Sequence, residues 1–320
     1  KAVQAEYPPA STFKIVTAIA GLEEGVIDAD TTFDCPGYLR FGNRTFRCWR
    51  RAGHGSVNVV KALTESCDVF FYHVGIELGI DRLAWYAKAC GLGSPTGVGL
   101  YPEGRGLIPT AAWKKKRVGV AWQRGETLSV AIGQGYDLTT PMQLTMLIAA
   151  VANGGTRLRP TLVKSIKSAD GAIITQAKPE VIGHLPISPA NLALVQQGLW
   201  NVVNTRKGTA HKVRIEGVEM CGKTGTAQVV GRKPGVKLSE EELAEHLKPH
   251  AWFVGYAPAV DPKIAVAVII ENGEHGSSAA APVVSTVIRN YLLGPEPEPE
   301  EGDEGAVAAT KGEGAPRPRG

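Results

Sequence analysis

The chain has no apolar run long enough to cross a bilayer. Its longest apolar stretches, such as Ile264 to Ile270, have the length of a strand, whereas a spanning helix needs about 20 residues. No secretory leader is present, the first residue is Lys1, and a candidate catalytic motif begins a few residues later. We therefore expect that an upstream anchor or signal is missing from this sequence.

The sequence also has little net charge and few cysteines. Lys plus Arg number 35 against 31 Asp plus Glu, and the excess is spread along the chain, so nucleic acid is not an implied partner. Five cysteines are an odd number and too few for a disulfide scaffold in 320 residues. The chain shows no internal repeat, and with 43% hydrophobic residues it can bury a substantial core.

Apolar periodicity predicts a mixed α/β protein of the α+β type, with an antiparallel sheet packed by the first and last helices. The segments between these elements are rich in glycine and read as irregular, among them 91–139. From residue 295 onward Pro, Glu and Gly dominate, so we expect one domain over 1–294 and a disordered tail over 295–320. The predicted helices are 11–24, 58–78, 81–90, 141–153, 189–204 and 278–293; the predicted strands are 162–168, 172–176, 218–230, 251–256 and 264–271.

Ser11 and Lys14 form a Ser-x-x-Lys motif at the start of the first predicted helix. A spacing of three places the hydroxyl and the amine on one helix face, which suits a serine nucleophile with a lysine base. A chain of this length contains about one such match by chance. Alone, the motif therefore allows a functional and an incidental interpretation.

Two further polar clusters stand in apolar surroundings. Lys223, Thr224, Gly225 and Thr226 lie in a strand-like run, where glycine signals close backbone approach and the Lys and hydroxyls could bind a carboxylate; a bulge or strand end is the alternative. The sequence Ser66-Cys67-Asp68 interrupts an apolar helical pattern, either on a solvated face or inside a cleft.

The order Ser-x-x-Lys, Ser-x-Asp, Lys-Thr-Gly is typical of serine β-lactamases and penicillin-binding proteins. The chain resembles penicillin-binding protein 2, the elongation-specific group of Gram-negative bacteria, over nearly everything up to Gly294. The matching segments are Tyr7-Pro8-Pro9-Ala10-Ser11-Thr12-Phe13-Lys14, Gly53-His54-Gly55, Ala131-Ile132-Gly133-Gln134-Gly135-Tyr136, Gly208-Thr209-Ala210-His211 and Gly222-Lys223-Thr224-Gly225-Thr226-Ala227-Gln228.

The resemblance implies the serine β-lactamase/DD-transpeptidase fold, with the catalytic serine between the sheet and a helical subdomain. It also implies a peptidoglycan DD-transpeptidase or carboxypeptidase that is acylated on Ser11 by D-Ala-D-Ala stem peptides and by β-lactams. Lys14 would act as base, Ser66 would relay a proton, and Asp68 would support Ser66. Lys223, Thr224 and Thr226 would bind the terminal carboxylate beside Gly225, while the N–H groups of Ser11 and Thr226 would form the oxyanion hole. Asp68 departs from the commoner Ser-x-Asn form, which affects only its hydrogen bonding.

The same resemblance places the protein at the periplasmic face of the inner membrane, held by the missing upstream segment, with shape and elongation membrane proteins as partners. Two alternatives keep the fold. A serine β-lactamase would need an extra general base for deacylation, and no acidic loop motif supplies one. A noncatalytic β-lactam sensor would be expected to carry a broken motif, and all three are intact.

Cys35, Cys48, His54 and Cys67 fall in one short region as C-x12-C-x5-H-x12-C. Three thiolates and an imidazole make a closed tetrahedral zinc set of the structural kind, although the spacing is not that of a zinc finger. Some relatives that the chain resembles carry zinc at these positions, with Asp at some of them. We expect a structural zinc that ties the loop to Ser66 and Asp68; the alternative is a Cys35–Cys48 disulfide. The acyl-transfer chemistry itself requires no cofactor. Cys90 and Cys221 read as packed core thiols.

Overall fold

The computed structural model describes residues 1–229 and 247–295. An antiparallel sheet of three strands stands at its centre, in the order β11 (Ile264–Ile270), β10 (His250–Ala257), β9 (Cys221–Ala227). The expectation of a disordered tail concerns residues outside this description, apart from position 295. No helix in the described ranges has the length and apolar character that crossing a bilayer requires.

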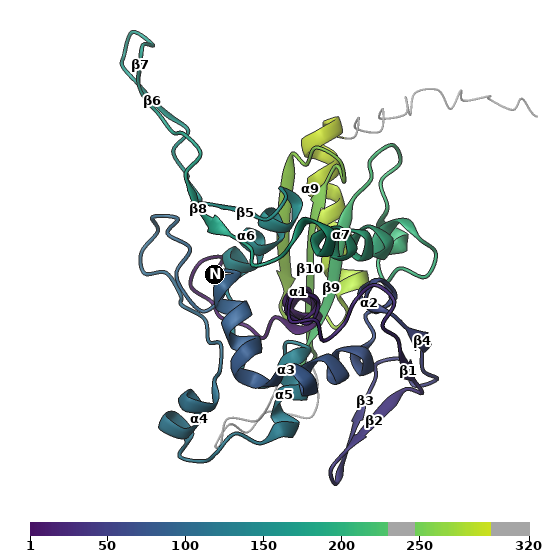
Figure 1. Ribbon diagram of the computed structural model, residues 1–320. Coiled ribbons are helices and arrows are strands. Elements are labelled where there is room, and N and C mark those ends of the chain that lie inside the picture. Colours follow the sequence, from purple (N-terminus) through teal and green to yellow (C-terminus); the bar gives the residue numbers. More distant parts are fainter. Residues whose placement is uncertain (230–246, 296–320) are drawn as a thin grey trace, which may run out of the picture.

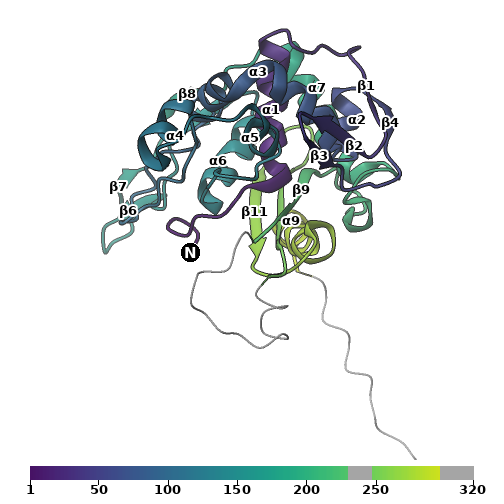
Figure 2. The same ribbon diagram turned by 90° about the horizontal axis from the view of Figure 1, so that it is seen from below.

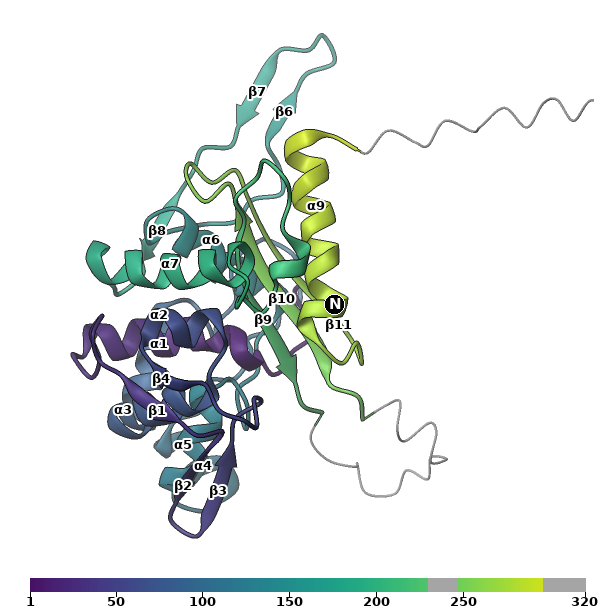
Figure 3. The same cartoon turned by 90° about the vertical axis from the view of Figure 1, so that its right-hand side faces the viewer.

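Helices cover both faces of the sheet, as Figure 3 shows. Helix α9 (Ala281–Leu293), preceded by the π-helical turn η3 (Gly276–Ala280), packs on one face; α6 (Pro141–Ala152) and α7 (Pro189–Asn204) pack on the other. Strand β10 has the alternation that this burial demands, because Phe253 lies in the cluster with α9 while Trp252 and Val254 belong to the larger core on the opposite side. The predicted antiparallel sheet and the last helix on it are therefore confirmed. The first predicted helix meets the sheet mainly through its N-terminal turn, Ala10–Phe13, and the face opposite α9 is covered by α6 and α7 instead.

Helix α1 (Lys14–Glu23) is the hub of the helical subdomain. It follows the 3-10 turn η1 (Ala10–Phe13) and contacts α3 (Asp68–Ala89) and α7, and every residue from Lys14 to Leu22 is buried. A helix that is apolar around its whole circumference is stable only when surrounded by protein. The subdomain is completed by α2 (Val59–Thr64), α4 (Ala111–Val118) and α5 (Arg124–Ala131).

Short strands form extensions on opposite flanks of the helical layer (Figures 1 and 2). On one flank, β1 (Phe33–Cys35) pairs with β4 (Gly55–Val57), and β2 (Tyr38–Phe41) with β3 (Arg44–Arg47). On the other, β5 (Thr156–Leu158) pairs with β8 (Val181–His184), and the predicted hairpin is present as β6 (Ser165–Lys167) and β7 (Ile173–Gln176). The 3-10 turn η2 (His211–Val213) follows α7.

One expectation is corrected, and another is extended. The predicted helix over 58–78 is interrupted at 65–67, because Ser66 adopts a left-handed φ of 54° that no α-helix accommodates. The segment 91–139 is irregular over most of its length, as expected, but it also contains two short helices that were not predicted, α4 and α5. Thr110 caps the first by accepting a hydrogen bond from the Trp113 N–H, and Gln123 forms a capping box with Glu126 on the second.

Candidate active site

Ser11 lies in η1, and Lys14 opens the helix that follows directly. Ser11 is partly exposed, whereas Thr12, Phe13 and Lys14 are buried. Ala10, just before the serine, has a φ of 51°, and its N–H donates to Gly133 O at 2.8 Å. A non-glycine residue in this region costs about 1 kcal/mol or more and persists only where surrounding contacts enforce it. The turn is therefore held in a fixed shape that leaves Ser11 partly exposed.

Lys14 reaches from this turn to the break between α2 and α3. Its side chain is 0% exposed, and Nζ donates to Asp68 Oδ1 at 2.6 Å, to Ser66 O at 3.0 Å and to Ser66 Oγ at 3.2 Å. A buried ammonium is stable only when paired and hydrogen-bonded, and these contacts satisfy all three of its donors. The first two sequence motifs therefore meet at one amine.

Lys223 approaches the same hydroxyl from the sheet. It is fully buried, and its Nζ donates to Ser66 Oγ at 2.8 Å. Burial first, and then the positive charge of Lys14, lower the pKa of Lys223 well below its ordinary value, while Asp68 acts in the opposite direction. Ser66 Oγ thus bridges two buried amines, and all three predicted motifs converge at the junction of sheet and helical subdomain.

The glycine of the third motif is required by packing. A Cβ on Gly225 would lie 2.9 Å from Trp252 Cβ and 3.3 Å from Thr12 Cγ2, so any side chain would push β9 away from η1. The close backbone approach expected from the sequence is thus an approach to the turn that carries Ser11. Beside it, Thr224 Oγ1 lies 2.8 Å from Thr209 Oγ1, and Thr226 O accepts from Gln134 Nε2 at 3.1 Å.

Trp49 belongs to the site, although none of the sequence motifs includes it. Its backbone N–H donates to Asp68 Oδ2 at 2.8 Å, and its indole Nε1 donates to Glu65 O and to Ser66 O, each at 3.0 Å. The residue is nevertheless 57% exposed. Nothing in the local pattern signals this role, because the partners come from a helix break that the periodicity did not predict. Thr209 and Gln134 were likewise known only as parts of matching segments.

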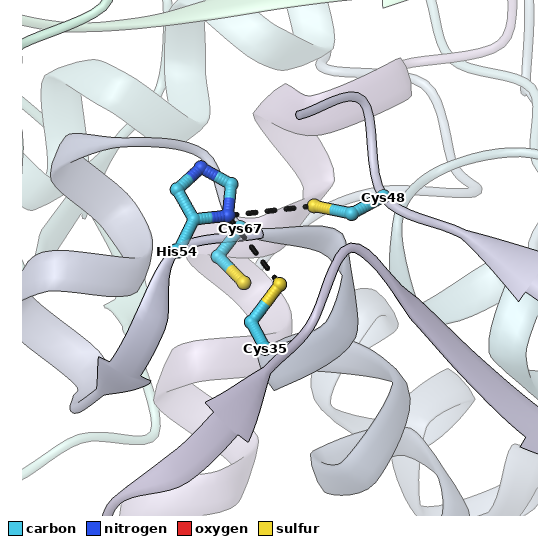
Figure 4. Close-up of side chains that lie close together, drawn as sticks. All are labelled: Cys35, Cys48, His54 and Cys67. Atoms are coloured by element: carbon cyan, nitrogen blue, oxygen red, sulfur yellow. Dashed lines mark hydrogen bonds between the residues drawn. The ribbon is translucent and has the colours of Figure 1, made fainter. Parts of the chain in front are cut away.

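The four predicted metal ligands form one buried cluster (Figure 4). The donor atoms of Cys35, Cys48, His54 and Cys67 all lie within 4.8 Å of one another, and His54 Nδ1 is 3.5 Å from both Cys35 Sγ and Cys48 Sγ. Tetrahedral bonds of about 2.3 Å to sulfur and 2.0 Å to nitrogen place such atoms about 3.6 Å apart. The donor set therefore fits one tetrahedral ion.

The thiols of this cluster are not joined to one another. All five cysteines are free, including Cys35 and Cys48, and Cys90 and Cys221 are buried as expected. A hydrogen bond from Cys67, together with one from His54, lowers the pKa of Cys48 to about 2, and the same contact raises that of Cys67. Burial raises the pKa of Cys35, so Cys48 is the thiol of the cluster whose thiolate, the form that binds a metal, is favoured. Cys67 and Cys48 also join it to the catalytic motifs, since Cys67 lies between Ser66 and Asp68 and Cys48 precedes Trp49.

Comparison with known proteins agrees with this arrangement. The family described as "Penicillin binding protein transpeptidase domain" matches residues 1–289. A peptidoglycan D,D-transpeptidase, MrdA, of Haemophilus influenzae is 40% identical over 298 residues, which are 91% of this chain and 45% of that protein. The chain thus spans about half the length of such relatives.

Two solved structures are similar throughout. The crystal structure of Pseudomonas aeruginosa PBP2 in complex with WCK 5153 has a TM-score of 0.78 at 39% identity, covering 91% of this chain and 60% of that one. PBP2 of Helicobacter pylori, in a complex with MreC, has a TM-score of 0.77 at 32% identity, covering 92% and 51%. The chain therefore belongs to the penicillin-binding protein transpeptidase domain family.

Proposed function

We propose that this domain is a serine DD-transpeptidase that cross-links peptidoglycan during cell-wall elongation through an acyl-enzyme on Ser11. The observation that carries the proposal is the position of Ser66 Oγ between the buried amines of Lys14 and Lys223, at 3.2 and 2.8 Å. Two amines joined by one hydroxyl can exchange a proton without contact with water. Family membership and the similarity to D,D-transpeptidases support the same reaction.

Acylation begins with Lys14 as the general base. In the resting arrangement Lys14 pairs with the Asp68 carboxylate at 2.6 Å, whereas burial lowers the pKa of Lys223 and favours its neutral form. Transfer of one proton from Lys14 through Ser66 Oγ to Lys223 leaves Lys14 neutral and able to accept the Ser11 proton. The attacked group is the carbonyl of the penultimate D-alanine, and the N–H groups of Ser11 and Thr226 form the oxyanion hole.

Collapse of the tetrahedral intermediate forms the Ser11 ester and breaks the D-Ala–D-Ala amide bond. Ser66 delivers its hydroxyl proton to the departing amine and takes in exchange the proton that Lys14 received from Ser11. The amine of a second stem peptide then attacks the ester, forms the cross-link and frees Ser11. Lys223, Thr224 and Thr226 hold the terminal carboxylate of the donor, and a β-lactam enters the same position and acylates Ser11.

We further propose that zinc occupies the cluster of Cys35, Cys48, His54 and Cys67. Its support is the donor chemistry and the 3.5 Å contacts of His54 Nδ1, which match a tetrahedral site. Bound there, the metal supplies structural cross-linking and takes no part in acyl transfer. The residues it joins fix the loop carrying Trp49 to the helix break at Ser66.

The cellular setting follows from the family. We propose that the domain works at the periplasmic face of the inner membrane, held there by a segment that precedes Lys1 in the full protein. The H. pylori PBP2 structure was obtained with MreC, and a similar chain comes from work on a peptidoglycan synthase complex. By analogy we propose shape and elongation proteins as partners.

A time course of intact mass after addition of benzylpenicillin tests the central proposal. A one-to-one adduct that lasts many minutes and is missing in Ser11→Ala is the expected result. Rapid loss of the adduct with hydrolysis of the drug would assign a β-lactamase instead. A stable adduct without turnover of any D-Ala-D-Ala peptide would assign a sensor.

A further inference from the structure

A pocket opens beside the catalytic centre and is not used by the mechanism above. Its volume is about 370 Å³, which lies within the range of small-ligand sites, and it is formed where α2 and α7 lie side by side (Figures 1 and 3). The lining includes Lys61, Glu65, Asn201, Thr205, Arg206 and Lys207.

The pocket and the active site share a wall. Glu65, in the pocket lining, directly precedes Ser66. The Thr209 N–H donates to Thr64 O at 3.3 Å, and the Thr209 hydroxyl contacts that of Thr224 at 2.8 Å. Since Thr64 lines the pocket, a molecule seated there is separated from the predicted carboxylate-binding strand by two threonines, Thr64 and Thr209.

The carbonyl groups at the ends of the two helices are already satisfied. The Thr205 N–H and hydroxyl both donate to Asn201 O, the Ala210 N–H donates to Val202 O, and the Glu65 N–H donates to Lys61 O. The Glu65 carboxylate forms an ion pair with the Arg50 guanidinium at 3.3 Å. The acceptors around the pocket thus have partners, and a cation would find little to bind.

The unused groups are donors. Among the described residues, the exposed Arg206 and Lys207 have no ion pair, and the Asn201 amide makes no hydrogen bond. Lys61 adds a third positive charge and is fixed by donating to His54 O and Ser56 O, each at 2.8 Å. Arginine and lysine beside an amide are the groups that bind a carboxylate.

We propose that this pocket is a second carboxylate subsite, which binds an acidic side chain of a stem peptide while Ser11 reacts with the D-Ala-D-Ala end or its ester. The inference rests on the proposed transpeptidase function and names an additional recognition element for the same substrate. The acidic group comes from either the donor or the acceptor strand, and the two sources affect different steps.

The test is the double variant Arg206→Gln/Lys207→Gln. Both side chains are exposed, so the fold should be unaffected and the rate of acylation by benzylpenicillin should stay within about twofold of wild type. The matched control is Lys115→Gln/Lys116→Gln, which removes the same charge from the exposed face of α4, away from the pocket (Figure 1).

The donor and the acceptor stem peptide are each used in two forms, one with a free acidic side chain and one with that side chain as the amide. If the donor supplies the carboxylate, the double variant should be acylated about fivefold more slowly by the acidic donor peptide, and at the wild-type rate by its amide. If the acceptor supplies it, the rate of acylation should be unchanged, and the rate of aminolysis by the acidic acceptor should fall by about fivefold. If the ratio of the rates with the acidic and the amidated peptide is the same in wild type and in the double variant, for both acylation and aminolysis, the subsite is refuted.

A binding measurement separates this inference from the proposed function. In a Ser11→Ala background no turnover occurs, and calorimetry should still show tighter binding of an acidic peptide than of its amide, with the preference lost in the double variant. If wild type turns over no D-Ala-D-Ala peptide but this preference is present, the proposed reaction fails and the subsite stands. Equal binding of the two forms removes the subsite whatever the turnover.

Discussion

Trp49 donates its backbone N–H to Asp68 Oδ2 at 2.8 Å, while Lys14 occupies the other oxygen of the same carboxylate at 2.6 Å. The aspartate is therefore held from both sides, by a loop residue and by the candidate base. Because Trp49 follows Cys48, any displacement of the metal-binding loop is transmitted directly to the groups around Ser66.

Replacing Trp49 by phenylalanine keeps a ring but removes the indole donor to the Glu65 and Ser66 carbonyls. One lost hydrogen bond is worth about 1 kcal/mol, so we expect acylation by benzylpenicillin to slow by about fivefold with a small change in melting temperature. Trp85→Phe is the matched control, since Trp85 is 58% exposed and its indole makes no hydrogen bond among the described residues. Equal rates in both variants would show that the indole contact does not position Ser66.

Gly225→Ala should affect catalysis more than stability. The added methyl would lie 2.9 Å from Trp252 Cβ and 3.3 Å from Thr12 Cγ2, and relieving such contacts costs about 1–3 kcal/mol. Since Thr12 belongs to the turn of Ser11, we expect at least a tenfold slower acylation, measured by stopped-flow with a chromogenic β-lactam. Gly125→Ala, where the nearest atom is 3.5 Å away, should behave as wild type. A wild-type rate of acylation in Gly225→Ala would mean that β9 and η1 can move apart without loss of catalysis.

Cys48→Ser should remove zinc and destabilise the loop. Protein purified without added metal is expected to contain one zinc per chain in wild type and in Cys90→Ser, and far less in Cys48→Ser, by elemental analysis. Loss of a structural metal should lower the free energy of unfolding by about 3 kcal/mol or more. A Cys35–Cys48 cross-link and no zinc in wild type would refute the site.

Lys223 should make stability depend on pH. Its lowered pKa means that the native state releases a proton which the unfolded chain keeps up to about pH 10.4, so this residue makes stability rise with pH from its native pKa up to that value. The slope for one group is about 1.4 kcal/mol per pH unit. When the free energy of unfolding is measured in urea between pH 7 and 9, it should rise less steeply with pH in Lys223→Met than in wild type. Parallel curves would indicate that Lys223 keeps its ordinary pKa in the fold.

Much of the fold could be predicted because its long elements have clear periodicity. Helices α6 and α7 begin at the predicted prolines, Pro141 and Pro189, and β10 and β11 lie where apolar runs indicated. The helix break at Ser66 could not be predicted, since a left-handed serine leaves no compositional signal. Helices α4 and α5 were missed because glycine and charged residues weaken the periodic pattern.

The candidate site shows the same division. Short motifs and their order predicted the catalytic residues Ser11, Lys14, Ser66, Asp68 and Lys223. In the structure Lys14 hydrogen-bonds to Ser66 and Asp68, and Lys223 hydrogen-bonds to Ser66. Trp49 and Thr209 could not be assigned, because their contacts depend on tertiary packing between segments far apart in sequence. The clustering of the four predicted metal ligands could be predicted because thiols and imidazoles are few, and their binding of zinc stays a prediction.

The enclosure of α1 limits how such an enzyme can diverge. Nine consecutive residues from Lys14 to Leu22 are buried, so a change there disturbs the core before it alters the choice of substrate. Only the Ser11 end of this helix meets incoming molecules. Adaptation to a new peptide, or escape from an inhibitor, is therefore confined to the rim, where Trp49, Gln134 and Thr209 surround a centre that must stay constant.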